Sequence, residues 1–185
     1  MWPPWVGGAA SGRSRRLRRQ GAHTVGRLDS RFTGSDLDAV GEFPEYDPAD
    51  VAVDAPYVAM LNDYLRRELG YKDDHIYDRQ AEVFPWSTEG FQFRYPYLGE
   101  ALREAMVKNP DLKVLVASGH YDLATPYFDA VFTARHLGLP EALRGNMKLT
   151  TYDAGHMMYI RRADHQKLKK EIAELIREGS AGRRK

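Results

Sequence analysis

Apolar and polar residues follow two different periods in the second half of the chain. The apolar runs at 113–117 and 147–152 are short and nearly continuous, as expected for strands buried on both faces of a parallel sheet. Apolar positions recur at helical spacing over 98–108, over 125–136 and again in a last segment up to 178. Helices that alternate with buried strands predict an α/β fold built on parallel strands.

The first half carries a weaker pattern. Apolar residues at helical spacing predict one helix over 57–69, closed by Gly70. Residues 24–32 predict an extended segment that could form one arm of a hairpin. The stretch 33–56 is rich in Asp, Pro and Gly and predicts a long loop, and loops of that length in compact domains are usually lids or binding loops.

These elements divide the chain into four parts. Residues 1–22 are expected to be a basic leader, either unstructured or the remnant of a helix. A cap-like segment follows at 23–97, then an α/β core at 98–178, and a frayed basic tail at 179–185. In the core, we expect Leu98 and Met106 to face inward from the first helix, and Ile172 and Ile176 to share one apolar face of the last.

Composition and charge narrow the classes of function. The 185 residues are 43% hydrophobic and 29% charged, which is typical of a globular protein, and the net charge of +1 favours neither nucleic acid nor a membrane surface as partner. Five arginines at 13–19 could form a nucleic-acid-binding arm, but no aromatic residue lies between them, so a solvated helix end is the favoured interpretation.

The chain contains no cysteine, which excludes disulfides and thiol catalysis. No apolar run approaches the length of a membrane span. The first twelve residues lack the charge pattern of a signal peptide, so the localisation stays open.

The candidate chemistry lies where the two predicted strands end. Asp122 follows the first strand in a Gly-His-Tyr-Asp turn, and His156 follows the second in an Ala-Gly-His sequence, where Gly155 allows a tight turn. One helix and one strand separate them, so both should reach the same edge of the sheet, within about 2.6–3.2 Å of each other. Asp122 could instead cap the following helix. Asp153, closer to His156 in the sequence, is interpreted as a turn residue.

Other polar residues fit a catalytic or metal-binding role less well. His120, Asp122, His136 and His165 do not have the spacing of a metal site, so we expect neither metal nor cofactor. The serines have no elbow signature and are interpreted as turn residues, namely Ser30, Ser35, Ser87 and Ser118. The three residues that directly follow His156 could line a pocket or could pack in the core instead. They are Met157, Met158 and Tyr159.

The two strand-end motifs, at 118–126 and 153–159, resemble the C-terminal portion of bacterial serine carboxypeptidases of the S10 family, which are related to cathepsin A. Residues 26–34, 61–69 and 85–87 carry the same resemblance. It implies the C-terminal part of an α/β-hydrolase fold and a serine-type carboxypeptidase that removes C-terminal residues from peptides or proteins without a cofactor. By the same resemblance, Asp122 is the triad acid, His156 is the triad base, and 33–56 belongs to an insertion that caps the active site.

The nucleophile of that family lies in a Gly-x-Ser-x-Gly elbow, and this sequence has none. Ser14 follows Gly12 at the right offset, but Arg16 replaces the second glycine. We therefore expect a fragment that is inactive in isolation, or alternatively a non-catalytic α/β interaction fragment. A fragment should leave the strand at 113–117 with an unpaired edge and its helices with uncovered apolar stripes, which would favour self-association.

Overall fold

The computed structural model describes residues 19–20, 23–36, 44–75, 77 and 97–181. They fall into two compact units. The first contains the described residues up to Gly26 and those from Phe32 to 77, and the second contains Arg27–Arg31 together with the residues from 97 onward.

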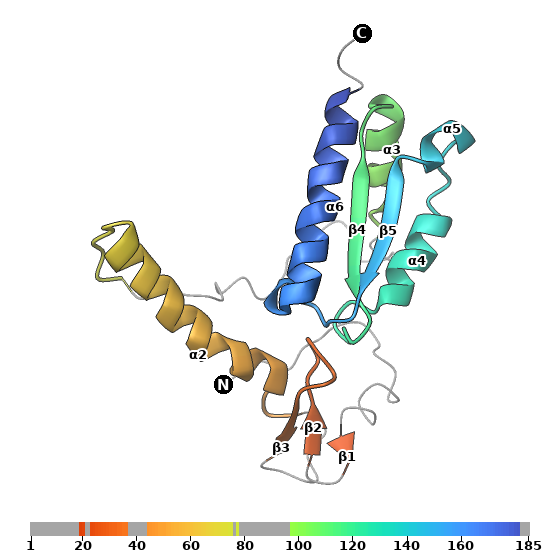
Figure 1. The fold of residues 1–185 in the computed structure, drawn as a ribbon. Helices are drawn as coiled ribbons and strands as arrows, with labels where there is room; N and C mark the ends of the chain where they lie inside the picture. Colours follow the sequence, from red (N-terminus) through yellow and green to blue (C-terminus); the bar gives the residue numbers. More distant parts are fainter. Residues whose placement is uncertain (1–18, 21–22, 37–43, 76, 78–96, 182–185) are drawn as a thin grey trace. The chain divides into compact units, whose positions relative to one another are not determined.

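The second unit is built on two parallel strands (Figure 1). Strand β4 (Val114–Gly119) pairs along its whole length with β5 (Met147–Tyr152). The register joins Val114 to Met147 and Gly119 to Tyr152, so both strands end level. The prediction at 147–152 is confirmed, and the strand predicted at 113–117 begins one residue later and ends two residues later. A mixed α/β unit with parallel strands is therefore confirmed.

Helices surround this pair of strands. Helix α3 (Gly99–Lys108) precedes β4, and α4 (Tyr127–Arg135) and the short α5 (Glu141–Arg144) connect β4 to β5. After β5, a 3-10 turn (Met158–Ile160) leads into α6 (Arg162–Ala181), which runs beside β4 (Figure 1). The helices predicted at 98–108 and 125–136 are confirmed to within two residues at each end. The tail predicted to fray from 179 is wrong up to 181, because α6 continues to Ala181; residues 182–185 lie outside the described part.

The core of this unit is small. Met106, Leu137 and Leu139 are buried, and Leu102, Val114 and Met147 pack against them. Gly138 lies between the two buried leucines in the left-handed region, with φ 68°, a conformation that glycine adopts without strain. The expectation for Met106 is confirmed, but Leu98 is 68% exposed because it lies at the N-cap, before the helical face begins.

Several apolar side chains of this unit are uncovered. Phe128 and Phe132 on α4 are 59% and 54% exposed, and Ile172 and Ile176 on α6 are 41% and 62% exposed. Among the described residues, β4 pairs only with β5, so its other edge has no strand neighbour. The predicted unpaired edge and the uncovered stripes are thus both present in the described part of the chain.

The first unit contains three short antiparallel strands in the order β1 (Arg19–Gln20), β2 (His23–Val25) and β3 (Thr33–Ser35). Strands β2 and β3 form a hairpin, with Thr24 opposite Gly34. The prediction of one extended segment over 24–32 is therefore wrong beyond Val25, because the chain turns over residues 27–31 before it returns as β3.

The long helix of this unit begins earlier than its apolar spacing predicted. Helix α2 spans Pro48–Asp63 and continues as a π-helix at Tyr64–Glu68. Asp47 caps it, because its carboxylate accepts a hydrogen bond of 2.9 Å from the amide of Ala49, and Pro48 takes the first helical position. The predicted loop at 33–56 is therefore wrong over 33–35, which form β3, and over 48–56, where Asp47 and Pro48 begin a helix.

No helix in the described part of the chain is long and apolar enough to cross a membrane. The arginines at 13–18, Ser14, Ser87 and the segment 85–87 lie outside the described residues.

Candidate active site at the ends of the parallel strands

The loops that follow β4 and β5 are joined by backbone hydrogen bonds. The amide of His120 donates to the carbonyl of Tyr152, and the amide of Tyr121 donates to that of Ala154, both at 3.0 Å. The pairing of the strands therefore continues into the two loops, and it carries Asp122 and His156 to the same edge.

Gly119 allows these loops to touch. A Cβ atom at this position would lie 2.1 Å from the carbonyl oxygen of Gly155 and 2.4 Å from that of Ala154. Because the obstructing atoms belong to the backbone, a larger residue could fit only if the two loops moved apart.

The predicted acid and base meet at this edge. Nδ1 of His156 lies 2.8 Å from Oδ2 of Asp122, within the predicted range. The Asp122 side chain is 4% exposed, whereas that of His156 is 45% exposed. The predicted approach of the two side chains is confirmed, and their catalytic role stays a prediction.

The Asp122 carboxylate is held by further donors. Oδ1 accepts from the amides of Ala124 at 2.7 Å and Thr125 at 2.9 Å, and Oδ2 accepts from the Thr125 hydroxyl at 2.5 Å. Asp122 therefore holds the turn before α4, but the alternative prediction that it caps this helix is wrong, because the N-cap residue is Pro126 and no side chain caps it. An ionised carboxylate accepts only, so His156 donates from Nδ1 and Nε2 is left as the basic nitrogen.

Thr125 is a site residue that the sequence did not reveal. Its Oγ1 lies 3.2 Å from Nδ1 of His156 as well as within hydrogen-bond reach of Asp122. It therefore limits rotation of both groups.

A third segment, Arg27–Arg31, packs against both loops. The carbonyl of Leu28 accepts a 2.7 Å hydrogen bond from the amide of His156. The carbonyl of Arg27 accepts from the amide of Leu123 at 3.0 Å, and the amide of Ser30 donates to the carbonyl of Tyr121 at 2.9 Å. Sequence spacing could not reveal these contacts, because they join residues about 90 to 130 positions apart.

Two charged residues shape this segment. The Asp29 carboxylate, on a residue only 4% exposed, accepts from Nη2 of Arg31 at 2.7 Å and from Nε at 3.0 Å. Burial by itself raises the pKa of Asp29, but the hydrogen bonds from Arg31 outweigh it, so the pKa lies below its usual value. The hydrogen bond from Arg31 to Asp29 correspondingly raises the pKa of Arg31.

Asp153 belongs to a surface ion pair. Among the described residues, no hydrogen bond or ion pair joins it to His156. Its carboxylate lies 2.8 Å from Nη1 of Arg161. A hydrogen bond to Asp153 raises the pKa of Tyr121. Asp153 itself lies in a bend directly after β5, which confirms the interpretation of it as a turn residue.

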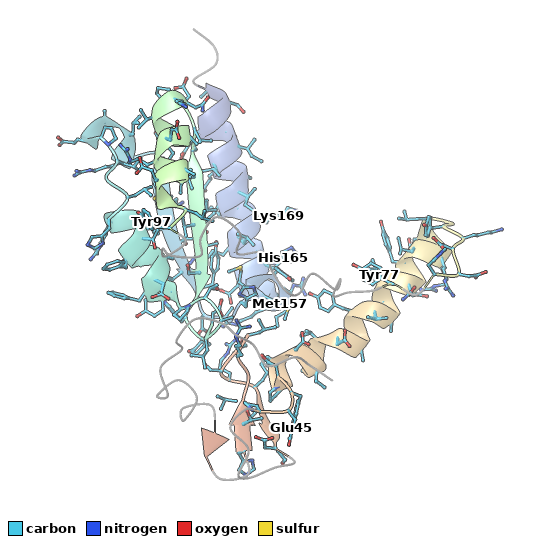
Figure 2. The ribbon with its side chains drawn as sticks, turned by 180° about the vertical axis from the view of Figure 1, so that it is seen from behind. Glu45, Tyr77, Tyr97, Met157, His165 and Lys169 are labelled. Carbon is cyan, nitrogen blue, oxygen red and sulfur yellow. The ribbon has the colours of Figure 1, made fainter. Side chains whose placement is uncertain are left out.

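The predicted pocket residues lie beside the site. Met157 and Met158 are half-buried and Tyr159 is exposed, and Figure 2 shows Met157 where the sheet ends and α6 begins. Their pocket-lining role stays a prediction.

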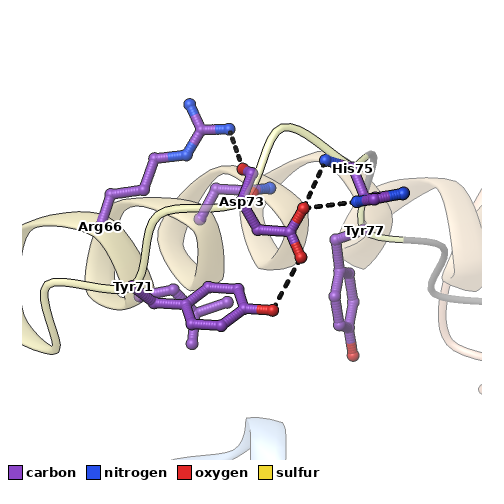
Figure 3. A pocket seen from close by; sticks show the side chains of 7 residues that line it. Arg66, Tyr71, Asp73, His75 and Tyr77 are labelled. Carbon is purple, nitrogen blue, oxygen red and sulfur yellow. Dashed lines mark hydrogen bonds and ion pairs between the residues drawn. The ribbon is translucent and has the colours of Figure 1, made fainter.

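A cavity lies instead in the first unit, against the end of the long helix (Figure 3). There the carboxylate of Asp73 accepts from the hydroxyl of Tyr71 at 2.7 Å and from the amide of His75 at 2.9 Å. Together with the His75 side chain, these hydrogen bonds lower the pKa of Asp73 to about 2. The His75 side chain is 93% exposed, so this cluster is a hydrogen-bonded turn at the surface.

The remaining histidines are not gathered into a site. The ring of His120 packs edge-on against Tyr127, and His136 stacks on Phe132 with ring centroids 4.0 Å apart. Within the described ranges, no three His, Asp or Glu side chains converge as metal ligands would. Comparison with protein-family models, curated proteins and solved structures found no match for this chain.

Proposed function

We propose that this chain supplies the acid and the base of a serine-type carboxypeptidase, as the C-terminal portion of an α/β-hydrolase. The observation that carries the proposal is the 2.8 Å contact between the buried carboxylate of Asp122 and the half-exposed imidazole of His156. The two groups lie after neighbouring parallel strands, which is where α/β-hydrolases hold these triad members.

In this proposal, Asp122 holds the imidazole with its proton on Nδ1. Nε2 of His156 accepts the proton of the attacking serine as its Oγ bonds to the carbonyl carbon of the C-terminal peptide bond. The imidazolium then gives that proton to the departing amino group, and the peptide stays as an ester on the serine. Water hydrolyses the ester with His156 again as the base, which restores the serine and releases the shortened peptide.

The nucleophile would have to come from elsewhere, because the sequence contains no Gly-x-Ser-x-Gly elbow. The resemblance to S10 carboxypeptidases assigns the serine and the oxyanion hole to the N-terminal half of such an enzyme. A chain without these groups loses most of the rate enhancement, so we propose that this chain is inactive in isolation.

Complementation tests this assignment. The chain is co-expressed with the N-terminal half of a related S10 carboxypeptidase, and the purified pair is assayed for release of the C-terminal amino acid from a blocked dipeptide. We expect activity that Asp122→Ala and His156→Ala abolish. His165→Gln is the matched control, since His165 is another exposed histidine of the same unit. Failure of the two chains to associate, or an inert complex, would contradict the proposal.

A second candidate is an α/β fragment that only binds a partner. The exposed Phe128 and Phe132 on α4 and Ile176 on α6 favour it, because apolar surface that is uncovered in the chain can be buried in an interface. If the complementation complex is active and His156→Ala abolishes that activity, the result favours the carboxypeptidase over a fragment that only binds a partner.

A further inference from the structure

We propose that Asp29 and Arg31 are positioning residues for the Asp122–His156 pair. Their ion pair fixes the segment Arg27–Arg31, and that segment sets the position of the His156 backbone. The catalytic meaning of the inference rests on the proposed function, whereas the structural link can be tested without any activity.

The segment bridges the acid and the base. Leu28 accepts a hydrogen bond from the amide of His156 itself, and Arg27 accepts one from Leu123, the residue after Asp122. A displacement of the segment would therefore move both loops. The 2.8 Å contact between the two side chains depends on that spacing, because a hydrogen bond weakens steeply once it lengthens or tilts.

The guanidinium of Arg31 holds the segment in a way specific to arginine. Nε and Nη2 bind the two carboxylate oxygens of Asp29, and Nη1 donates to the carbonyl of Asp153 at 3.0 Å. The same group lies 4.5 Å from the ring centre of Tyr121. All three guanidinium nitrogens are used, and a lysine ammonium has no fork with which to reproduce this arrangement.

The turn before His156 packs closely against Asp29. A Cβ atom on Gly155 would lie 2.4 Å from both the Cβ of Asp29 and the carbonyl oxygen of Leu28. A side chain at this position would push Arg27–Arg31 away from the base, so Gly155→Ala perturbs the same link from the opposite side.

Two signals of His156 report on this link. The first is its imidazole tautomer, which the contact with Asp122 fixes with the proton on Nδ1. The second is solvent exchange of its backbone amide, which the carbonyl of Leu28 protects. A residue that only stabilises the fold would change exchange in the β4–β5 ladder equally, whereas a positioning residue changes His156 selectively.

The experiment uses the full chain labelled with 15N, at a pH where the imidazole is neutral. Long-range proton–nitrogen spectra give the tautomer, and amide exchange is followed for His156 and for Val116 in the ladder. The variants are Arg31→Ala, Arg31→Lys and Gly155→Ala. Arg103→Ala is the matched control, because Arg103 pairs with Glu100 in the same unit and its side chain is 38% exposed, against 37% for Arg31.

We expect amide exchange of His156 to become at least about tenfold faster in all three variants, together with a mixture of tautomers, while Val116 and the control stay unchanged. Unchanged His156 signals in Arg31→Lys and Gly155→Ala would overturn the inference. Equal loss of protection at Val116 and His156 would overturn it too, because Arg31 would then serve the fold as a whole. A wild-type imidazole without its proton on Nδ1 would instead contradict the proposed function, and the amide of His156 would still decide the positioning role.

Discussion

Removal of one hydroxyl from the interface between β5 and α6 should cost stability in a pH-dependent way. Tyr152 is 1% exposed, and its hydroxyl donates to the carboxylate of Glu171 on α6. Burial and the hydrogen bonds from Tyr152 and Thr150 act on the pKa of Glu171 in opposite directions, and the hydrogen bonds prevail and lower it. Tyr152→Phe deletes the donor and keeps the ring, over which Nζ of Lys167 lies at 4.5 Å.

The size of the stability loss depends on the hydrogen bonds that Glu171 keeps after the substitution. A hydrogen bond to a charged group contributes about 1.5–3 kcal/mol. Glu171 still accepts from the Thr150 hydroxyl at 3.0 Å after the substitution, so its carboxylate is not left without a partner. We therefore expect the lower end of the range, a loss of about 1.5 kcal/mol of unfolding free energy near pH 7, or roughly tenfold in the equilibrium constant.

The sign of the pH dependence follows from the lowered pKa. Stabilisation by an ionised Glu171 is fully present above the unfolded pKa, about 4.5, and is lost as the pH falls through the lower folded value. The difference between wild type and Tyr152→Phe should thus shrink as the pH falls below about 4.5. Urea unfolding, followed by circular dichroism at one protein concentration, measures it, and Tyr159→Phe is the exposed control. An equal loss at pH 7 and at pH 3 would refute the reasoning.

Three further outcomes are expected. Gly119→Ala should destabilise the chain by about 1–3 kcal/mol in urea because its methyl group meets two backbone carbonyls, while Gly145→Ala, which meets no atom within 4 Å, should be nearly neutral. The purified chain should release no amino acid from a peptide and should not react with a fluorophosphonate probe; stoichiometric labelling of any serine would reveal a nucleophile. Light scattering should show concentration-dependent association that Ile176→Lys reduces, whereas a monomer at all concentrations would contradict it.

Local patterns predicted the second unit well. The apolar strands at 113–117 and 147–152 and the helices around them leave a clear period, and the contact of Asp122 with His156 followed from their places after neighbouring strands. The start of α2 does not follow from the apolar pattern, because Asp47 and Pro48 belong to residue types that are common in loops and also begin helices.

The support of the site could not be predicted in the same way. Arg31 and Asp29 are two positions apart in a turn without a period, and the contacts of this turn with the site run through Leu28 and Gly155, which meet only after folding. Thr125 likewise contacts His156 only through the tertiary structure. Periodicity indicates which face of an element is buried, but it contains no information on which loops touch.

Because β4 and β5 end level, insertions and deletions should be tolerated in some segments of the chain and not in others. Each strand residue advances the chain by about 3.3 Å, so one inserted residue in either strand would displace its loop by more than the length of the Asp122–His156 contact. The same insertion would turn every following side chain to the opposite face of the sheet. Insertions in the connection around α5, outside the paired strands, leave that register intact. Related chains should therefore vary in length in the connection around α5, and each of the two strands should keep its length of six residues.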